Sequence, residues 1–405
     1  MPMMVGTFSV DYKYFYLYIT LYSVKPQDKF RMRLLIFISS MAGGGAERVS
    51  ANLANYWAAK EWDITIVTLA QQRLDFYDLH PAVKRIALDL AGESANALAG
   101  LLRNVRRVLA LRRVLRQLQP DIALGMMTTA DVLLALAAWR LPMLRTVGAE
   151  RNHPPQMPLG YLWETLRSHT YGLLNAVTAL SREGKDWIKT HTNAQQVTVI
   201  PNAVTWPLPR QEPRMNPNAL CRSERQLLLA VGRLEAQKGF DWLIEAFSTL
   251  ADKHSDWDLV ILGEGSLRTT LEGQVRASGL DQRIFLPGRA GNVGEWYESA
   301  DLYVMSSRFE GFPNTLVEAM AHGLAAVSFD CDTGPRDIIR QELDGLLVPP
   351  GNIAELTTAL DRLMSDALTR QHFAERAVEV RERFSMARIA GMWEKLFNGL
   401  LLEQK

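Results

Sequence analysis

The chain has 405 residues, of which 48% are hydrophobic, and it carries a formal net charge of +1. A chain of this length can bury two sizeable cores, and a single domain this long would be unusual. The only cysteines, Cys221 and Cys331, exclude a disulfide framework and a cysteine-based metal site, which favours a reducing, cytoplasmic compartment. The apolar runs at 14–24 and 122–139 do not qualify as membrane spans, because the first is too short and the second contains Asp131.

Charge is unevenly distributed along the chain. Residues 32–205 contain 19 Lys and Arg against 13 Asp and Glu, a net charge of +6. Residues 206–405 contain 22 against 29, a net charge of −7. A basic first half and an acidic second half predict two domains with different partners.

Residues 1–31 precede the first regular pattern. The sequence MRLLIFISS, which starts at Met32, resembles a first strand and offers an alternative translation start. We therefore interpret 1–31 as an N-terminal extension outside the native protein; the alternative is an aromatic anchor at a membrane interface.

Short apolar runs alternate with helical patterns over residues 32–205. Such nearly continuous apolar runs are typical of parallel strands that are covered on both faces. The predicted strands are RLLIFISS, DITIVTL, DIALGM, MLRTVGA, AVTALS and VTVIPN, and the predicted helices are 46–59, 101–118, 159–172 and 182–190.

The same alternation resumes after a linker at residues 206–221, where four prolines fall within Thr205–Leu220. Over residues 222–385 the predicted strands lie in QLLLAVGRL, DLVILG, RIFLPG, DLYVMSS and AAVSFD. The last helical pattern, within 386–405, can pack back on the first domain, but periodicity alone leaves this open. The sequence thus predicts an α/β protein with two doubly wound, Rossmann-like domains that face each other across a ligand-binding cleft.

One predicted helix of the first domain is strongly basic. Residues 103–116, RNVRRVLALRRVLR, carry six arginines and no acid, and an apolar stripe runs through Val108, Leu111, Leu115 and Leu118. A helix of this kind can bury its stripe and present arginine to an anionic membrane surface. A solvated helix face is the alternative, and nucleic acid is disfavoured because no aromatic residues interleave the arginines.

Two turns have the composition of phosphate-binding sites. Gly43, Gly44 and Gly45 follow the first strand and open a helix, so backbone N–H groups can approach a phosphate there. The pattern is not GxGxxG, which disfavours an NAD-dependent dehydrogenase. In the second domain, Arg233 and Lys238 flank a strand-to-helix turn and suit a diphosphate. A ligand-free turn in the first case, and exposed loop charge in the second, are the alternatives.

The stretch RFEGFPNTLVEAMAHG places Glu310 and Glu318 on either side of a predicted helix start. Asn314 is the predicted N-cap of this helix, and its first amides offer a second phosphate seat. The arrangement suits a ligand with hydroxyl groups at both ends of a phosphate. It suits a metal poorly, because no histidine or further acid converges on it. The DxD tripeptide at 330–332 follows a buried strand, so no metal is expected there.

The series GGGAER, VGRLEAQKG, FEGFPNTLVEAMAHG, FDCDTGPRDII and DGLLVPPGN resembles the family 4 retaining glycosyltransferases of the GT-B fold. The similarity runs over nearly the whole chain from Met32. The resemblance implies that Arg233 and Lys238 hold the diphosphate of a nucleotide-sugar, that Glu318 holds its ribose and that Glu310 holds its sugar. It also implies donor contacts from Gly43, Gly44, Gly45, Asn314, Thr315 and Leu316, contact of the base with the loop at Arg289, and no metal or other cofactor.

Within the family, the segment Glu150–Asn152 and the sequence DCDTGP look like a subgroup that builds glycan repeat units on polyprenyl-diphosphate lipids. Arg151, Asn152 and His153 are the corresponding candidates for contact with the acceptor or the donor sugar. The resemblance implies a peripheral enzyme on the inner face of the cytoplasmic membrane. It would transfer a hexose or N-acetylhexosamine from a UDP-sugar, rather than a GDP-sugar, to a lipid-linked or other glycan in exopolysaccharide or O-antigen synthesis. The alternatives are a nucleotide-sugar epimerase or hydrolase on the same fold and a non-catalytic nucleotide-sugar-binding subunit.

Overall fold

The structure, a computed structural model, describes residues 31–92, 97–220 and 224–403. The predicted extension therefore lies, except for Arg31, outside the described residues, and so does Cys221. Among the described helices, none combines the length and the apolar character needed to cross a membrane. Residues 33–405 form one compact unit with two sheets.

The first lobe is built on a parallel sheet of seven strands in the order β3-β2-β1-β4-β5-β6-β7. Its strands are β1 (Arg33–Ile38), β2 (Asp63–Thr68), β3 (Lys84–Ala87), β4 (Ile122–Met126), β5 (Arg145–Ala149), β6 (Ala176–Ala179) and β7 (Val197–Val199). Its helices are α2 (Gly45–Ala59), α3 (Ala97–Leu118), α4 (Thr128–Ala138), α5 (Tyr161–Thr170) and α6 (Arg182–His191). Every residue of β4 is buried, as expected of a parallel strand covered on both faces.

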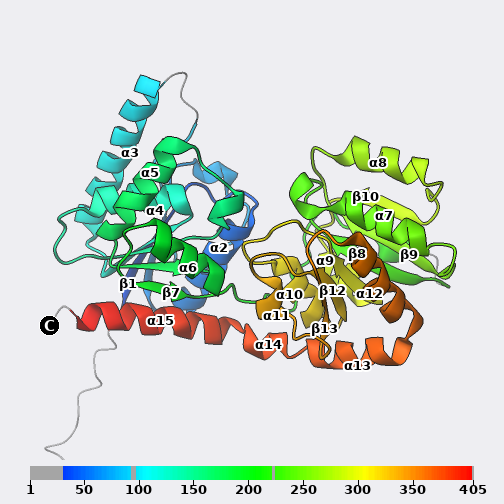
Figure 1. Cartoon of the computed structure of the whole chain (residues 1–405). Helices are drawn as coiled ribbons and strands as arrows, with labels where there is room; N and C mark the ends of the chain where they lie inside the picture. The colour runs from blue at the N-terminus through cyan, green and yellow to red at the C-terminus, as the bar shows by residue number, and fades with distance from the viewer. Residues whose placement is uncertain (1–30, 93–96, 221–223, 404–405) are drawn as a thin grey trace, which may run out of the picture. The chain divides into compact units, whose positions relative to one another are not determined.

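The second lobe repeats the plan with six strands in the order β10-β9-β8-β11-β12-β13, again all parallel. Its strands are β8 (Gln226–Val231), β9 (Trp257–Leu262), β10 (Ile284–Gly288), β11 (Leu302–Met305), β12 (Ala326–Phe329) and β13 (Gly345–Val348). Its helices are α7 (Phe240–Leu250), α8 (Arg268–Ala277), α9 (Val293–Ser299), α10 (Asn314–Ala321), α11 (Pro335–Ile338), α12 (Ile353–Ser365) and α13 (Ala367–Ala377). Figure 1 shows each sheet flanked by helices.

Both sheets reverse their strand order at one point, between β1 and β4 in the first lobe and between β8 and β11 in the second. Ligands of doubly wound sheets bind at this reversal, beyond the carboxyl ends of the strands. The chain segments that leave β1, β8 and β11 are those that contain the glycine run, the Arg-Lys turn and the two glutamates. The predicted fold of two doubly wound, Rossmann-like domains is confirmed, and its topology brings the predicted motifs to the two reversal points.

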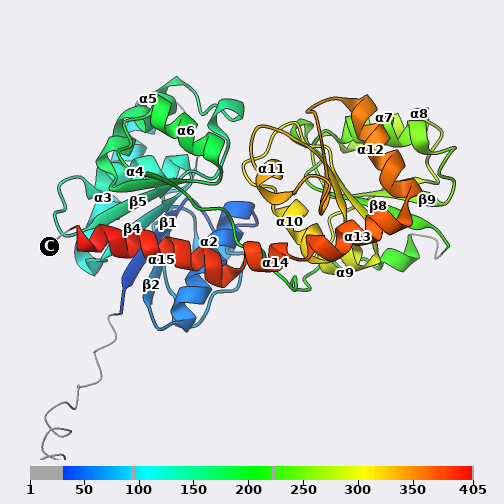
Figure 2. The same ribbon diagram turned by 60° about the horizontal axis from the view of Figure 1, so that its bottom comes forward.

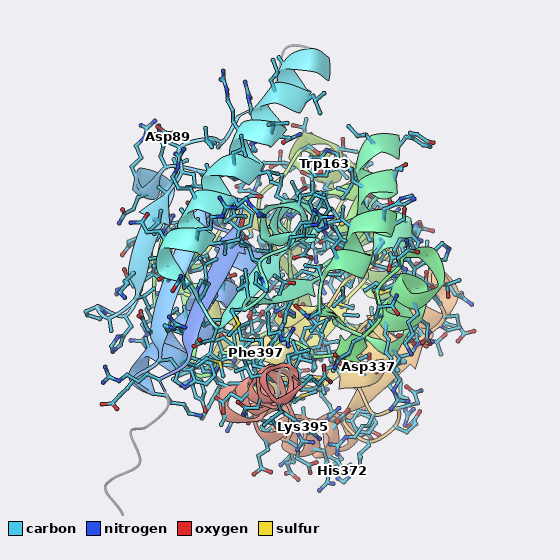
Figure 3. All side chains as sticks on the ribbon, turned by 90° about the vertical axis from the view of Figure 1, so that its left-hand side faces the viewer. Asp89, Trp163, Asp337, His372, Lys395 and Phe397 are labelled. Carbon is cyan, nitrogen blue, oxygen red and sulfur yellow. The ribbon has the colours of Figure 1, made fainter. Side chains whose placement is uncertain are left out.

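The chain returns to the first lobe after α14 (Val380–Arg383) through α15 (Met386–Leu402). The return is hydrogen-bonded to the segment after β7, since the Val204 amide donates to the Phe384 carbonyl at 2.8 Å. Figures 1 and 2 both show α15 along the first lobe, and α15 contacts α2. Figure 3 looks along α15, with Phe397 on the side toward the sheet and Lys395 on the opposite side. Thus α15 packs on the first lobe, a packing that the sequence pattern left open.

Candidate functional site

The turns after β8 and β11 are locked together in the second lobe. Lys238 Nζ donates to Glu310 Oε1 at 2.5 Å, and Ser307 Oγ donates to the same carboxylate oxygen at 2.7 Å. Gly239 has φ 62°, and a Cβ there would lie 2.1 Å from the Ser306 carbonyl oxygen, so only glycine fits. These contacts fix Lys238 and Glu310 relative to each other before any ligand binds.

The helix start between the two glutamates differs in one detail from the prediction. The helix α10 begins at Asn314 itself, Pro313 occupies the cap position, and no side chain caps the helix. The Asn314 Oδ1 atom instead accepts a hydrogen bond from Asn202 Nδ2 of the segment after β7, at 3.0 Å. Asn314 is therefore not the N-cap, because its side chain is used in a contact between the lobes.

Glu318 lies one turn further along α10 and is buried. Its carboxylate Oε1 forms an ion pair with Arg48 of α2, so this contact also joins the two lobes. The Glu318 carboxylate raises the pKa of the Arg48 guanidinium. The two glutamates of the motif are thus both ion-paired, one within the second lobe and one to the first.

The glycine run of the first lobe faces this helix start. Gly45 is the first residue of α2, and a Cβ at this position would lie 3.6 Å from the side-chain nitrogen Nδ2 of Asn314. The Gly44 carbonyl accepts a hydrogen bond from the Tyr77 hydroxyl at 2.9 Å. The Glu47 carboxylate, in the first turn of α2, lies over Gly44, so a side chain at position 44 would require the Glu47 side chain to move.

A cleft of about 610 Å³ lies between these elements. Most of the predicted donor-site residues line it, whereas Leu316 is fully buried in α10 and Glu318 faces a neighbouring cavity. The predicted residues in the lining of the cleft are Gly43, Gly44, Gly45, Arg151, Asn152, Arg233, Lys238, Glu310, Asn314 and Thr315. Arg233 is exposed there, which leaves its side chain accessible to a ligand.

The neighbouring cavity has a volume of about 200 Å³. Arg289 and Glu318 line it together with Phe76 and Tyr77 from the first lobe. The Arg289 guanidinium lies 5.3 Å from the centre of the Phe76 ring, in a cation–π arrangement. The loop that the resemblance assigns to the base therefore lies beside a separate cavity, which adjoins the main cleft at Arg48 and Tyr77.

The segment after β5 carries the Glu150–Asn152 sequence into a buried polar cluster. Glu150 accepts hydrogen bonds from Thr128 Oγ1 at 2.8 Å and from the Tyr171 hydroxyl at 2.8 Å. Asp131 lies in the same cluster, and burial together with the Glu150 charge raises its pKa well above the usual range. Glu150 therefore links the segment after β5 to α4 and to Tyr171 inside the first lobe.

The next residues of this segment separate in the structure. The Arg151 guanidinium is buried 5.7 Å from the Trp393 ring of α15, and burial lowers its pKa to about 10. His153 is buried, with Nε2 3.7 Å from Asp332 Oδ2 of the second lobe, and burial lowers the pKa of His153. Their predicted roles in sugar binding stay predictions.

The side chains of the DxD tripeptide at 330–332 lie in different surroundings. Cys331 is buried, while the Asp332 side chain is 64% exposed. No group of three or more His, Cys, Asp or Glu side chains in the described ranges is placed to hold a metal ion.

Two family models match the chain on either side of the linker. The model described as Glycosyltransferase Family 4 matches residues 43–205, and the one described as Glycosyl transferases group 1 matches residues 213–380. The chain belongs to the family 4 glycosyltransferases. The family and enzyme class that the motifs predicted are thereby confirmed.

Two glycosyltransferases and one phosphotransferase resemble the chain over 72% to 90% of its length. A glycosyltransferase of Haemophilus influenzae without an assigned activity is 26% identical over 87% of this chain and 96% of its own. The GalNAc-alpha-(1->4)-GalNAc-alpha-(1->3)-diNAcBac-PP-undecaprenol alpha-1,4-N-acetyl-D-galactosaminyltransferase of Campylobacter jejuni is 24% identical over 90% and 98%. An exopolysaccharide phosphotransferase of Streptomyces coelicolor is 30% identical over 72% of this chain, which spans 30% of that protein.

Solved structures of glycosyltransferases share the fold. Sucrose-phosphate synthase from Thermosynechococcus elongatus superposes with a TM-score of 0.76 at 18% identity, over 92% of this chain and 100% of that one. The lipopolysaccharide outer core galactosyltransferase WaaB in its apo form gives a TM-score of 0.69 at 21% identity, over 92% and 99%. The predicted GT-B fold is confirmed by these likenesses, which at such identities concern the fold alone.

Several residues of this family 4 glycosyltransferase site were missed by sequence reasoning. Arg48 and Glu47 belong to the quoted GGGAER motif, but neither was assigned a contact. Asn202 ends the predicted strand run VTVIPN and Tyr77 lies in a segment with no predicted element, and both reach the cleft only through tertiary folding. The signal for Arg48 was its place one helical turn after the glycine run, where a side chain can reach across a cleft.

Proposed function

We propose that the chain transfers a hexosyl or N-acetylhexosaminyl unit from a nucleotide-sugar to a lipid-linked or other glycan, with retention of anomeric configuration. The observation that carries the proposal is the convergence of Arg233, Lys238 and Glu310 on one cleft, with Glu318 at its border. Cations next to carboxylates match a donor that has a diphosphate between two hydroxyl-bearing rings. A UDP-sugar is the proposed donor class rather than a GDP-sugar.

The proposed reaction follows from where these charges lie. The acceptor hydroxyl oxygen forms a bond to the anomeric carbon on the face from which the diphosphate departs. The bond between that carbon and the diphosphate oxygen breaks, and the acceptor proton passes to the leaving diphosphate. Arg233, Lys238 and the first amides of α10 stabilise the departing charge, which is the largest electrostatic demand of the step. Glu310 is engaged with Lys238 and Ser307, so it is not placed as a free nucleophile.

The acceptor is proposed to be a glycan on a polyprenyl diphosphate. The support is the Campylobacter jejuni relative, which is named for a PP-undecaprenol glycan acceptor. A lipid acceptor requires the enzyme to work at a membrane surface, on the inner face of the cytoplasmic membrane under this proposal.

The exposed face of α3 supports that location. Leu111 and Leu115 are buried in the first lobe, while Leu102 and Leu109 on the opposite face are 55% and 58% exposed. Arg106, Arg113 and Arg116 are exposed as well. On a helix these exposed residues lie within one face, which would place apolar and cationic side chains together against anionic lipid.

Two of the six arginines that were predicted to face lipid are engaged elsewhere. Arg107 donates to the Leu90 and Gly92 carbonyls, and Arg112 donates to the carbonyls of Ala137 and Trp139. The long Arg side chain reaches over the helix edge to these loop carbonyls, which helical-wheel reasoning cannot show. The proposed membrane contact is therefore made by the exposed face of α3 and not by all six arginines.

The test of the proposed function begins with thermal-shift measurements of the whole protein with UDP, GDP and their sugars. Transfer assays with the best-binding donor and a polyprenyl-diphosphate glycan then compare wild type with Arg233→Ala. The substitution removes a hydrogen bond between the guanidinium and the diphosphate. Such a bond to a charged group contributes about 1.5–3 kcal/mol, so kcat/KM for the donor should fall by about 10- to 100-fold. The remote, exposed Arg276→Ala serves as the control with the same change of charge. Unchanged kinetics in Arg233→Ala would remove the diphosphate role, and hydrolysis or epimerisation without transfer would favour the alternative enzyme.

A further inference from the structure

Arg48 lies at the border between the main cleft and the neighbouring cavity. It lines both of them, as does Tyr77. On the side of the main cleft are Arg233, Lys238 and the glycine run, and on the other side is Glu318. A change of its side-chain conformation alone would therefore move the Arg48 guanidinium from Glu318 in the neighbouring cavity into the main cleft, without any movement of α2.

The charges at the site are paired in a way that a donor would disturb. Glu310 is bound to Lys238 and Glu318 is bound to Arg48, so each glutamate of the motif holds a cation. The Glu318 side chain is 6% exposed and the Arg48 side chain 29% exposed. If ribose hydroxyls take Glu318, the guanidinium loses its partner, and a charge left uncompensated in such surroundings is strongly unfavourable.

The nearby groups offer few alternatives to Glu318. Besides Glu318, the titratable groups that act on Arg48 are the phenols of Tyr77 and Tyr297, and burial raises the pKa of both, so neither offers a negative charge. Glu47 precedes Arg48 directly on α2, and adjacent residues of a helix do not face each other. The strongest anion expected in the cleft is the donor diphosphate itself.

We propose that Arg48 exchanges partners when the donor binds, leaving Glu318 to the ribose and binding the diphosphate from the side of the first lobe. The inference rests on the proposed function and adds a donor-binding residue to it. The guanidinium would face the diphosphate across the cleft from Arg233 and Lys238, and its planar fork suits two phosphate oxygens at once. Donor binding would thus break the ion pair between Arg48 and Glu318, which joins the two lobes. The lobes would then be joined through the bound diphosphate, with Arg48 on one side of it and Arg233 and Lys238 on the other.

Partner exchange makes a distinctive prediction about nucleoside and nucleotide. A nucleoside competes with Arg48 for Glu318 but has no phosphate with which the guanidinium could pair. A nucleoside diphosphate offers the guanidinium a new partner. Removal of the guanidinium should therefore weaken binding of the diphosphate while it leaves nucleoside binding unchanged or makes it tighter.

The experiment measures dissociation constants by calorimetry for wild type, Arg48→Ala, Arg48→Lys and the control Arg276→Ala. The probes are UDP and uridine, or GDP and guanosine if wild type prefers GDP. We expect Arg48→Ala to raise the Kd for the diphosphate at least tenfold and not to raise the Kd for the nucleoside. Arg48→Lys should recover part of the loss, and the control should match wild type.

Two results would overturn the inference in different ways. If Arg48→Ala weakens nucleoside and diphosphate by the same factor, or weakens neither, then Arg48 does not bind the diphosphate and the proposed function stands without it. If wild type binds neither UDP nor GDP, the proposed function fails first and the inference fails with it. Circular dichroism of each variant confirms that a loss of binding is not a loss of fold.

Discussion

At the scale of single residues, the site is organised by pairs of opposite charge held in place by the turns around them. Glu310 accepts from both Lys238 and Ser307, and Thr333 donates to the Glu310 backbone carbonyl. Such fixed geometry costs no rearrangement when charge develops on a ligand. The position of Glu310 is therefore set by the protein and not by the donor.

The first prediction at this scale concerns Glu310→Gln. Gln keeps the size of the side chain and an acceptor oxygen, but Lys238 loses its anionic partner. We expect a loss of about 1.5–3 kcal/mol in the free energy of unfolding, because a hydrogen bond to a charged group is lost. We expect a fall in kcat of about 100-fold, since hydroxyl contacts to a charged carboxylate strengthen in the transition state. Urea denaturation and steady-state transfer kinetics measure the two effects.

The control for this substitution is Glu342→Gln at an exposed ion pair. Glu342 binds Arg362 at 2.7 Å, with both side chains about half exposed. Exposed pairs contribute about 0–1 kcal/mol, so this variant should keep nearly full stability and full activity. If Glu310→Gln behaved like the control in both measurements, Glu310 would have no part in the donor site.

The residues also show where sequence reasoning stops. Glu310 and Glu318 could be predicted as a pair because eight residues separate them on one turn and one helix. Arg48 could not be paired with Glu318, which is 270 residues away, because no local pattern encodes a contact across the cleft. For the same reason the spacing that suggested an N-cap at Asn314 was misleading, since Asn202 engages that side chain.

At the scale of elements, the longer buried strands could be predicted, whereas the four-residue strand β13 was missed although three of its residues are buried. The apolar runs of β1 and β4 are buried along almost their whole length, and both were predicted. The edge strand β3 has the sequence KRIA and is only partly buried, so it is too short and too polar to be recognised as a strand. The helix predicted at 101–118 is observed as α3, with its apolar stripe inward as expected.

The prediction at this scale tests the exposed face of α3. Changing Arg106 and Arg113 to Gln removes two cations of that face, and each contributes about 1 kcal/mol to binding near an anionic surface. The partition coefficient onto vesicles rich in phosphatidylglycerol should therefore fall about 30-fold, as measured by sedimentation. Since the attraction is electrostatic, raising the salt concentration should reduce the difference.

A charge-matched control separates this face from net charge alone. Arg276 and Arg388 are exposed on α8 and α15, and changing both to Gln alters the total charge by the same amount. This variant should keep wild-type binding to vesicles. Equal loss in the two double variants, or no loss in either, would mean that α3 does not face the membrane.

At the scale of the whole molecule, the order of segments along the chain differs from the way in which they pack into the two lobes. The last helix follows the second lobe in sequence but is bound to the first. Trp57 Nε1 of α2 donates to Glu394 at 3.1 Å, and Arg145 of β5 donates to the Leu400 carbonyl at 3.0 Å. The first lobe is therefore incomplete until the end of the chain has been made.

The final prediction follows from this arrangement and concerns Trp393→Ala. Trp393 is fully buried in the face that α15 presents to the first lobe, next to Phe397 and under the Arg151 guanidinium. Removing a buried Trp side chain costs about 3–5 kcal/mol. Hydrogen exchange should become faster in α15, α2 and β1, while the strands of the second lobe keep their protection, because local opening follows contacts and not chain order. The exposed Trp139→Ala is the matched control and should leave both lobes unchanged. Faster exchange of equal size in β8–β13 would show instead that α15 stabilises both lobes as one cooperative unit.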